Sequence, residues 1–243
     1  MVMVLTVLGF SIFFVSGNDV NIESVFKPKK ELPIYYVDTD EKKIAISFDA
    51  AWGDEHTKSI LDTLDKYNVK TTFFLVDFWV NEHPEAVKEI DARGHEVANH
   101  STTHPKMTEL SKEGMIKEIK TTEESIEKII GKKTTLFRPP FGDYNDNLIQ
   151  TCREIDYHVI QWDVDSLDWK ELGAQSVVDR VTRNVKNGSI VLFHNNAKHV
   201  PEYLPIVLEK LQKEGYEIVP ISKLIHKDNY YIDNSGKQIQ ENK

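Results

Sequence analysis

Polar residues follow five apolar segments of the sequence, and their types are those that hydrolytic chemistry uses. They are Asp49 after KIAISF, His100 and His104 in NHSTTH, Arg138 in RPPFG, Asp168 in DVDSLDW, and His194 after IVLF. Carboxylates and imidazoles transfer protons, imidazoles also bind metal ions, and a guanidinium can orient a carboxylate. If these segments meet in space, their residues predict metal-assisted attack of water on an acyl group.

His100 and His104 are four residues apart, which brings two imidazoles within reach of one divalent ion. The spacing alone is weak, because 9 histidines in 243 residues produce such pairs by chance. Two solvated loop histidines are therefore the alternative interpretation. The position of the pair directly after an apolar segment favours a metal site, where an ion would lower the pKa of a bound water to about 7.

A water activated in this way needs a base and an acid, and Asp49 and His194 are the candidates. Arg138, beside the rigid turn PPFG, could hold Asp49 bidentately, and Asp168 could orient His194 and raise its pKa. Trp169 offers an apolar wall on which a sugar could stack. The ordinary alternatives are loop caps for the aspartates, a core histidine, and a surface ion pair for the arginine.

The elements that must position these residues alternate between short apolar runs and amphipathic segments. Strands are predicted at residues 43–49, 71–76, 96–99, 134–139, 158–164, 189–194 and 216–222. Helices are predicted within residues 56–68, 83–94, 111–131, 176–188 and 204–215, the third of them between Ser111 and Gly131. This alternation predicts an α/β fold with a parallel sheet, in which the ends of the strands converge on one site.

Composition and charge exclude several other functions. The net charge is −9 and no dense run of Lys or Arg occurs, which argues against nucleic acid as a partner. Cys152 is the single cysteine, so the chain can form no internal disulfide and has no cysteine zinc site. Nothing in the sequence indicates an obligate interface, and we expect a monomer.

The two ends of the chain differ from its middle. Residues 2–15 are apolar but shorter than the roughly 20 residues that cross a bilayer, so residues 1–33 are predicted to be an export signal or short membrane anchor plus a linker. A buried N-terminal strand or helix is the alternative. Residues 34–228 are the predicted catalytic domain, and residues 229–243 are predicted to be a polar tail without regular structure.

Taken together, the motifs resemble those of the polysaccharide deacetylases of the NodB-homology type, carbohydrate esterase family 4, over about residues 42–224. The matching segments are SFDAAWGDE, HSTTH, RPPFG, VDSLDW and LFH. The resemblance implies a distorted (β/α) barrel of about seven parallel strands. It also implies metal-dependent removal of N-acetyl groups from amino-sugar polymers.

The resemblance also assigns roles to residues. It implies that Asp49 is the base, His100 and His104 are metal ligands, Arg138 orients the base, His194 is the acid and Asp168 tunes the acid. Phe141, Gly142, Tyr144 and Trp169 are the implied substrate-binding residues. The family's second aspartate, a metal ligand, is Ala50 here, and Asp54 in the same loop is the candidate replacement. The implied cofactor is a divalent metal, with zinc first and cobalt or manganese next.

These observations predict an exported N-deacetylase acting on peptidoglycan or a chitin-like glycan, and the variant first motif resembles forms associated with the cell walls of spore-formers. Two alternatives stay open. Ala50 favours a glycan-binding relative with an impaired metal site, and an esterase acting on O-acetylated xylan would use the same residues.

Overall fold

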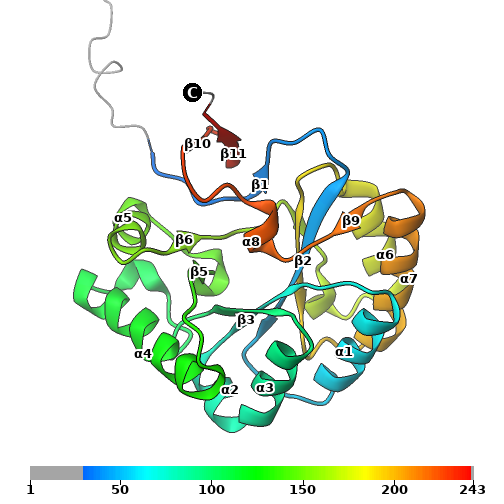
Figure 1. Ribbon diagram of the computed structural model, residues 1–243, viewed down its shortest axis with the longest axis horizontal. Coiled ribbons are helices and arrows are strands. Elements are labelled where there is room, and N and C mark those ends of the chain that lie inside the picture. Colours follow the sequence, from blue (N-terminus) through cyan, green and yellow to red (C-terminus); the bar gives the residue numbers. More distant parts are fainter. Residues whose placement is uncertain (1–29, 242–243) are drawn as a thin grey trace, which may run out of the picture. The chain divides into compact units, whose positions relative to one another are not determined.

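A parallel sheet forms the centre of the molecule in the computed structural model, which describes residues 30–241 (Figure 1). Its strands lie in the order β6, β5, β4, β3, β2, β8, β7, and β9 pairs with the first residues of β2. Their bounds are β2 Lys43–Ala50, β3 Thr72–Leu75, β4 Glu96–Asn99, β5 Leu136–Phe137, β6 His158–Val159, β7 Val164–Asp165, β8 Ile190–His194 and β9 Glu217–Ile218. Every pairing within this sheet is parallel.

Helices surround the sheet (Figure 1). They are α1 Thr57–Lys66, α2 Asp77–Glu82, α3 Pro84–Ala92, α4 Lys112–Ile130, α5 Asp146–Glu154, α6 Ala174–Asn184, α7 Val200–Lys213 and α8 Ile221–Leu224. Helix α4 begins after Ser111, whose hydroxyl accepts from the backbone N–H of Gly114, and ends at Gly131 in the left-handed conformation. Between residues 30 and 241 no helix is long and apolar enough to cross a membrane. The predicted export segment lies outside the described residues.

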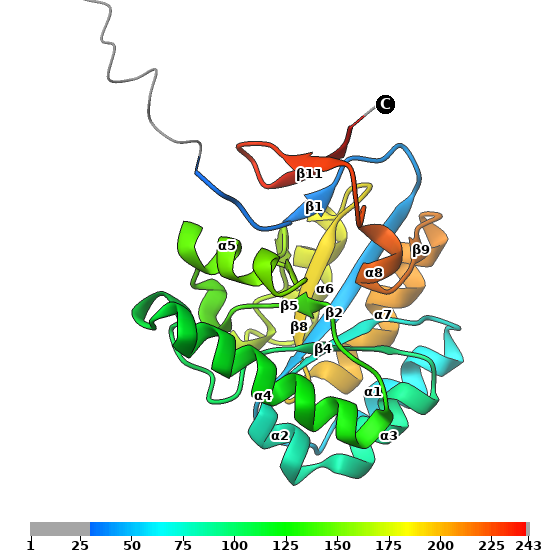
Figure 2. The same ribbon diagram turned by 60° about the vertical axis from the view of Figure 1, so that its left-hand side comes forward.

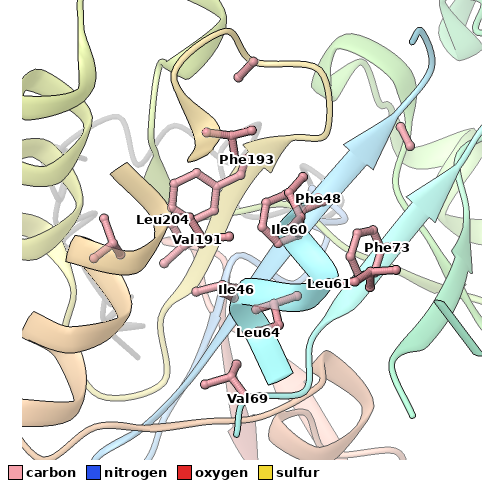
Figure 3. Close-up of a cluster of buried hydrophobic side chains, with 14 of the residues drawn as sticks. Ile46, Phe48, Ile60, Leu61, Leu64, Val69, Phe73, Val191, Phe193 and Leu204 are labelled. Carbon is pink, nitrogen blue, oxygen red and sulfur yellow. The ribbon is translucent and has the colours of Figure 1, made fainter. Parts of the chain in front are cut away.

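The alternation of side chains along β2 divides the core into two parts. Ile44, Ile46 and Phe48 pack with helix residues in the larger apolar cluster, and the ring of Phe48 stacks on Phe73 at 5.2 Å and on Phe193 at 5.6 Å (Figure 3). Ala45, which points the other way, belongs to a second cluster inside the curved sheet. Asp49 has the parity of Ala45 and therefore faces the inside of the sheet.

The predicted strand at residues 158–164 is wrong as a single element. The structure contains two short strands there, β6 and β7, which lie at opposite edges of the sheet. Ile160 instead forms a parallel bridge with Ile34, and the carboxylate of Asp163 accepts from the backbone N–H of Ile190 at 2.9 Å. The segment thus crosses between the two edges. The predicted strand at residues 216–222 is likewise shorter, because Pro220 has no N–H to donate and precedes helix α8.

The C-terminal stretch is ordered into strands, so the prediction that it has no regular structure is wrong for residues 229–241. β10 (Tyr230–Ile232) and β11 (Lys237–Gln240) form a second sheet with β1 (Tyr36–Val37), in the order β1, β11, β10. Figure 2 shows β11 beside β1. The carboxylate of Asp233 accepts from the N–H groups of Ser235 and Lys237 and closes the turn between β10 and β11. The prediction failed because the polar residues of this turn have the composition of a loose tail.

Gln238→Ala tests whether this second sheet contributes to stability. The buried Gln238 amide accepts from the N–H of His226 at 2.9 Å and donates to the carbonyl of His226 at 2.7 Å. Losing both bonds should lower the free energy of unfolding by about 1–3 kcal/mol in urea titrations. The exposed control Glu241→Ala should change it by less than about 0.5 kcal/mol. Equal effects of the two substitutions would contradict this description of the C-terminus.

Candidate active site

Asp49 and Arg138 form a buried ion pair at the ends of β2 and β5. Arg138 Nη1 donates to Asp49 Oδ1 at 2.7 Å, and the side chains are 0% and 8% exposed. The pair forms a single hydrogen bond rather than the bidentate contact that the sequence predicted; Arg138 Nη2 donates instead to the carbonyl of Gln161. The guanidinium lies 4.1 Å from the ring centroid of Phe74.

The charges around Asp49 keep it ionised despite its burial. Burial alone would raise the pKa of this carboxyl, but the positive charge of Arg138, with contributions from His100 and His194, holds the pKa below its usual value. Asp49 is therefore a carboxylate at neutral pH and can accept a proton.

His100 follows β4, and the backbone of Arg138 fixes its tautomer. Its Nδ1 lies 2.7 Å from the carbonyl oxygen of Arg138, which can only accept, so Nδ1 carries the hydrogen. The lone pair of Nε2 is then free, and Nε2 lies 3.5 Å from Asp49 Oδ2. Two electron-rich atoms face each other here, an arrangement that a cation or a proton between them would stabilise.

His104 lies beside His100, with ring centroids 5.0 Å apart. Burial lowers the pKa of His104 to about 4 and also lowers the pKa of His100. Both rings are therefore neutral at pH 7, the state in which imidazole binds metal ions without first losing a proton. The structure thus brings together the two predicted metal ligands and the predicted base.

The proposed third metal ligand is not brought to this pair. Asp54 Oδ2 lies 3.8 Å from His83 Nδ1, and Ala50 packs in the larger apolar cluster. Within residues 30–241, no three His, Cys, Asp or Glu side chains form a group that could hold a metal ion. In this structure Asp54 therefore lies in no ligand group with His100 and His104, and its role as a replacement for the missing aspartate stays a prediction. The described residues thus offer two neutral imidazoles, those of His100 and His104, beside the carboxylate of Asp49.

His194 ends β8 directly opposite Asp49 in the strand register. Its Nδ1 lies 2.7 Å from Asp168 Oδ1, and Asp168 Oδ2 accepts from the His194 N–H at 2.8 Å and from the Tyr203 hydroxyl at 2.8 Å. Burial lowers the pKa of His194, but the hydrogen bond and the charge of Asp168 outweigh it, and the pKa is raised. Tyr203, which the sequence did not single out, thus anchors the carboxylate that supports His194.

Exposed aromatic side chains lie around His104. Its ring centroid is 4.6 Å from that of Phe141 and 5.2 Å from that of Trp52, and both aromatic side chains are more than half exposed. Trp169, next to Asp168, is also exposed. The sequence analysis did not identify Trp52, although its position in the loop that follows β2 indicated a place at the site. These rings offer flat apolar surfaces suited to sugar faces.

The other two predicted substrate-binding residues differ in placement. Gly142 has a φ of 66°, and a Cβ atom there would lie 3.2 Å from Gln161 Oε1, so the turn after Arg138 requires glycine. Tyr144 instead pairs with Tyr35, with hydroxyl oxygens 3.1 Å apart, and packs against the cluster that contains Leu148 and Tyr157. Gly142 is therefore connected to the site through Gln161, which contacts both Gly142 and Arg138. Tyr144 packs against its neighbours.

Sequence comparisons identify relatives of the chain. The family pattern described as "Polysaccharide deacetylase" matches residues 36–160. The peptidoglycan-N-acetylmuramic acid deacetylase PdaC of Bacillus subtilis is 37% identical over 202 residues, which are 83% of this chain and 42% of PdaC. A peptidoglycan-N-acetylglucosamine deacetylase of Bacillus cereus is 36% identical over 194 residues, 78% of this chain and 91% of that protein. The chain thus spans less than half of PdaC.

Among solved structures, BA3943 of Bacillus anthracis, described as a CE4 family pseudoenzyme, superposes with a TM-score of 0.77 at 34% identity, covering 80% of this chain and 69% of BA3943. A BA3943 mutant described as having restored enzymatic activity gives the same TM-score at 35% identity, covering 80% of this chain and 71% of that one. This likeness confirms the predicted distorted (β/α) barrel.

Arg138→Met tests the buried ion pair. It leaves the Asp49 carboxylate buried without a cation, and the free energy of unfolding at pH 7 should fall by about 3–5 kcal/mol. The double variant Asp49→Asn/Arg138→Met should recover much of this loss, because no uncompensated charge remains. The surface control Arg183→Met should cost less than about 0.5 kcal/mol in the same urea titrations. A single variant as stable as the native protein would contradict the pairing.

Proposed function

The chain belongs to the polysaccharide deacetylase family, and from this premise we propose that it removes acetyl groups from the N-acetylated amino sugars of peptidoglycan. In this reaction water adds to the acetamide carbonyl, the carbon–nitrogen bond breaks, and acetate and a free amine leave. Asp49 takes the proton of the attacking water, and His194 donates a proton to the departing nitrogen.

One observation carries the proposal: Asp49 and His194 lie opposite each other on neighbouring strands, and their pKa values are shifted in opposite directions. Arg138 lowers the first and Asp168 raises the second. At one pH the carboxylate can accept a proton while the imidazolium can give one, which is the condition for acid and base catalysis at a single site. A module that only binds a glycan needs neither arrangement.

We assign His100 and His104 as the residues that would hold a divalent ion, with zinc first and cobalt or manganese next. When bound, such an ion polarises the acetyl carbonyl and lowers the pKa of water. The fixed tautomer of His100 and the neutral state of both rings suit them to this role. Trp52, Phe141 and Trp169 would contact the sugar rings around the scissile group.

Peptidoglycan is the proposed substrate because the two relatives compared above are named for it, with a chitin-like glycan next. A cell-wall substrate requires export, which agrees with the apolar segment at residues 2–15 as a signal or anchor. Muramic acid and glucosamine residues are both open as the deacetylated sugar, since the relatives differ in this respect.

A second candidate is a glycan-binding protein without catalytic activity. It is favoured by the lack of a three-ligand group among residues 30–241 and by the structural likeness to BA3943, described as a pseudoenzyme. In this case the aromatic rings around His104 would bind the glycan, and Asp49 and His194 would catalyse no reaction.

The test is acetate release by the purified protein, stripped with a chelator and reloaded with zinc, cobalt or manganese. We expect release from peptidoglycan or chitooligosaccharides, removal of activity by the chelator, and a loss of about 100- to 10,000-fold in Asp49→Asn. The surface control Asp40→Asn should retain full activity. Glycan binding without acetate release under any metal would favour the second candidate, and release from acetylated xylan alone would indicate an esterase.

Asp168→Asn tests the pairing of the acid. Because the raised pKa keeps His194 protonated to higher pH, activity should decline only above that pKa. Removing the negative charge lowers the pKa, so the alkaline limb of the kcat/KM profile should move to lower pH. The profile of Asp40→Asn should match that of the native protein. An unmoved alkaline limb in Asp168→Asn would mean that His194 is not the acid.

A further inference from the structure

The loop from His100 to His104 has a backbone conformation that it does not favour by itself. Ser101 has a φ of 71° and His104 a φ of 55°, both in the left-handed region. Residues other than glycine occupy this region at a cost in free energy and keep it only where surrounding groups determine the conformation. The direction of the His104 ring depends on this backbone.

Glu118 of helix α4 accepts four of the hydrogen bonds that hold the loop. Its Oε2 accepts from the backbone N–H of Thr102 at 2.9 Å and of Thr103 at 2.8 Å. Its Oε1 accepts from the hydroxyl of Thr103 at 2.9 Å, and its backbone carbonyl accepts from the hydroxyl of Thr102 at 2.8 Å. Both side-chain oxygens and the main chain of one residue thus contact the loop.

The N–H groups of Ser101 and His104 are bonded to side chains as well. Asn99 Oδ1 accepts from the N–H of Ser101 at 2.9 Å, and the hydroxyl of Ser101 accepts from the N–H of His104 at 3.1 Å. Asn99 also donates to the carbonyl of Ile119 in α4. All four N–H groups from residue 101 to residue 104 are therefore bonded to side chains, and Glu118 accepts two of them.

We propose that Glu118 is a positioning residue that fixes the loop and so directs the ring of His104 toward His100 and Asp49. Two successive N–H groups that point at one oxygen form a concave site for an anion, and here the anion is part of the protein. Hydrogen bonds to a carboxylate are stronger than those to a neutral acceptor. The link to metal binding rests on the proposed function, whereas the link to loop conformation does not.

Glu124 is the acidic side chain of α4 that serves as the control for Glu118. It is exposed on the same helix, whereas the carboxylate of Glu118 accepts from the loop. A role limited to helix solubility would make the two residues equivalent on substitution. A positioning role predicts that substitution of Glu118, but not of Glu124, changes the loop from His100 to His104, which is distant from Glu118 in the chain.

Amide hydrogen exchange of the metal-free protein tests the loop directly. In Glu118→Ala the N–H groups of Thr102 and Thr103 should lose most of their protection, while buried positions of α4 such as Ile119 keep theirs. Glu118→Gln retains one acceptor oxygen and should show a smaller loss. Glu124→Ala should match the native protein. Native protection of Thr102 and Thr103 in Glu118→Ala would overturn the proposal.

Zinc titration of the same variants tests the consequence for His104. Glu118→Ala should weaken zinc affinity by about 10- to 100-fold, Glu118→Gln by less, and Glu124→Ala not at all. Unchanged affinity in Glu118→Ala would overturn the proposed control of His104. If the native protein itself binds no zinc, the metal assignment of the proposed function fails, and the exchange measurement still decides the role of Glu118.

Discussion

The guanidinium of Arg138 and the carboxylate of Asp49 meet at 2.7 Å in a place that water barely reaches. Taking both charges out of water is costly, and the cost is offset only because they are paired. The same arginine directs a second feature of the site, since its backbone carbonyl holds Nδ1 of His100. One residue after β5 thus keeps the carboxylate of Asp49 ionised and leaves the lone pair of the neighbouring His100 imidazole available.

The alternation of side chains along β2 determines what else the site can contain. Asp49 faces the inside of the sheet, opposite His194, whereas Ala50 packs in the larger apolar cluster. With alanine at that position, the proposed metal site would rely on two imidazoles beside Asp49. The proposed base and acid, by contrast, each have their partner, since Arg138 contacts Asp49 and Asp168 contacts His194.

The sequence predicted those parts of the site that depend on strand ends. Apolar runs such as IVLF are visible by composition, and in a parallel sheet their carboxyl ends meet, so Asp49, Arg138 and His194 could be grouped in advance. The split of residues 158–164 into β6 and β7 could not be predicted, because it depends on pairing with Ile34, far away in the chain. The strands at the C-terminus could not be predicted, because the turn between them is made of polar residues. The role proposed for Glu118 could not be predicted either, because this residue lies on an ordinary helix face.

The central claim is that Asp49 is an ionised base held by Arg138 inside the barrel. A carbon-13 NMR titration of the Asp49 side-chain carboxyl in the metal-free protein measures this directly, with Asp49→Asn used to assign the signal. The account predicts a midpoint below the ordinary aspartate pKa of about 3.9. A midpoint at or above that value would show that burial outweighs the arginine, and would contradict the account.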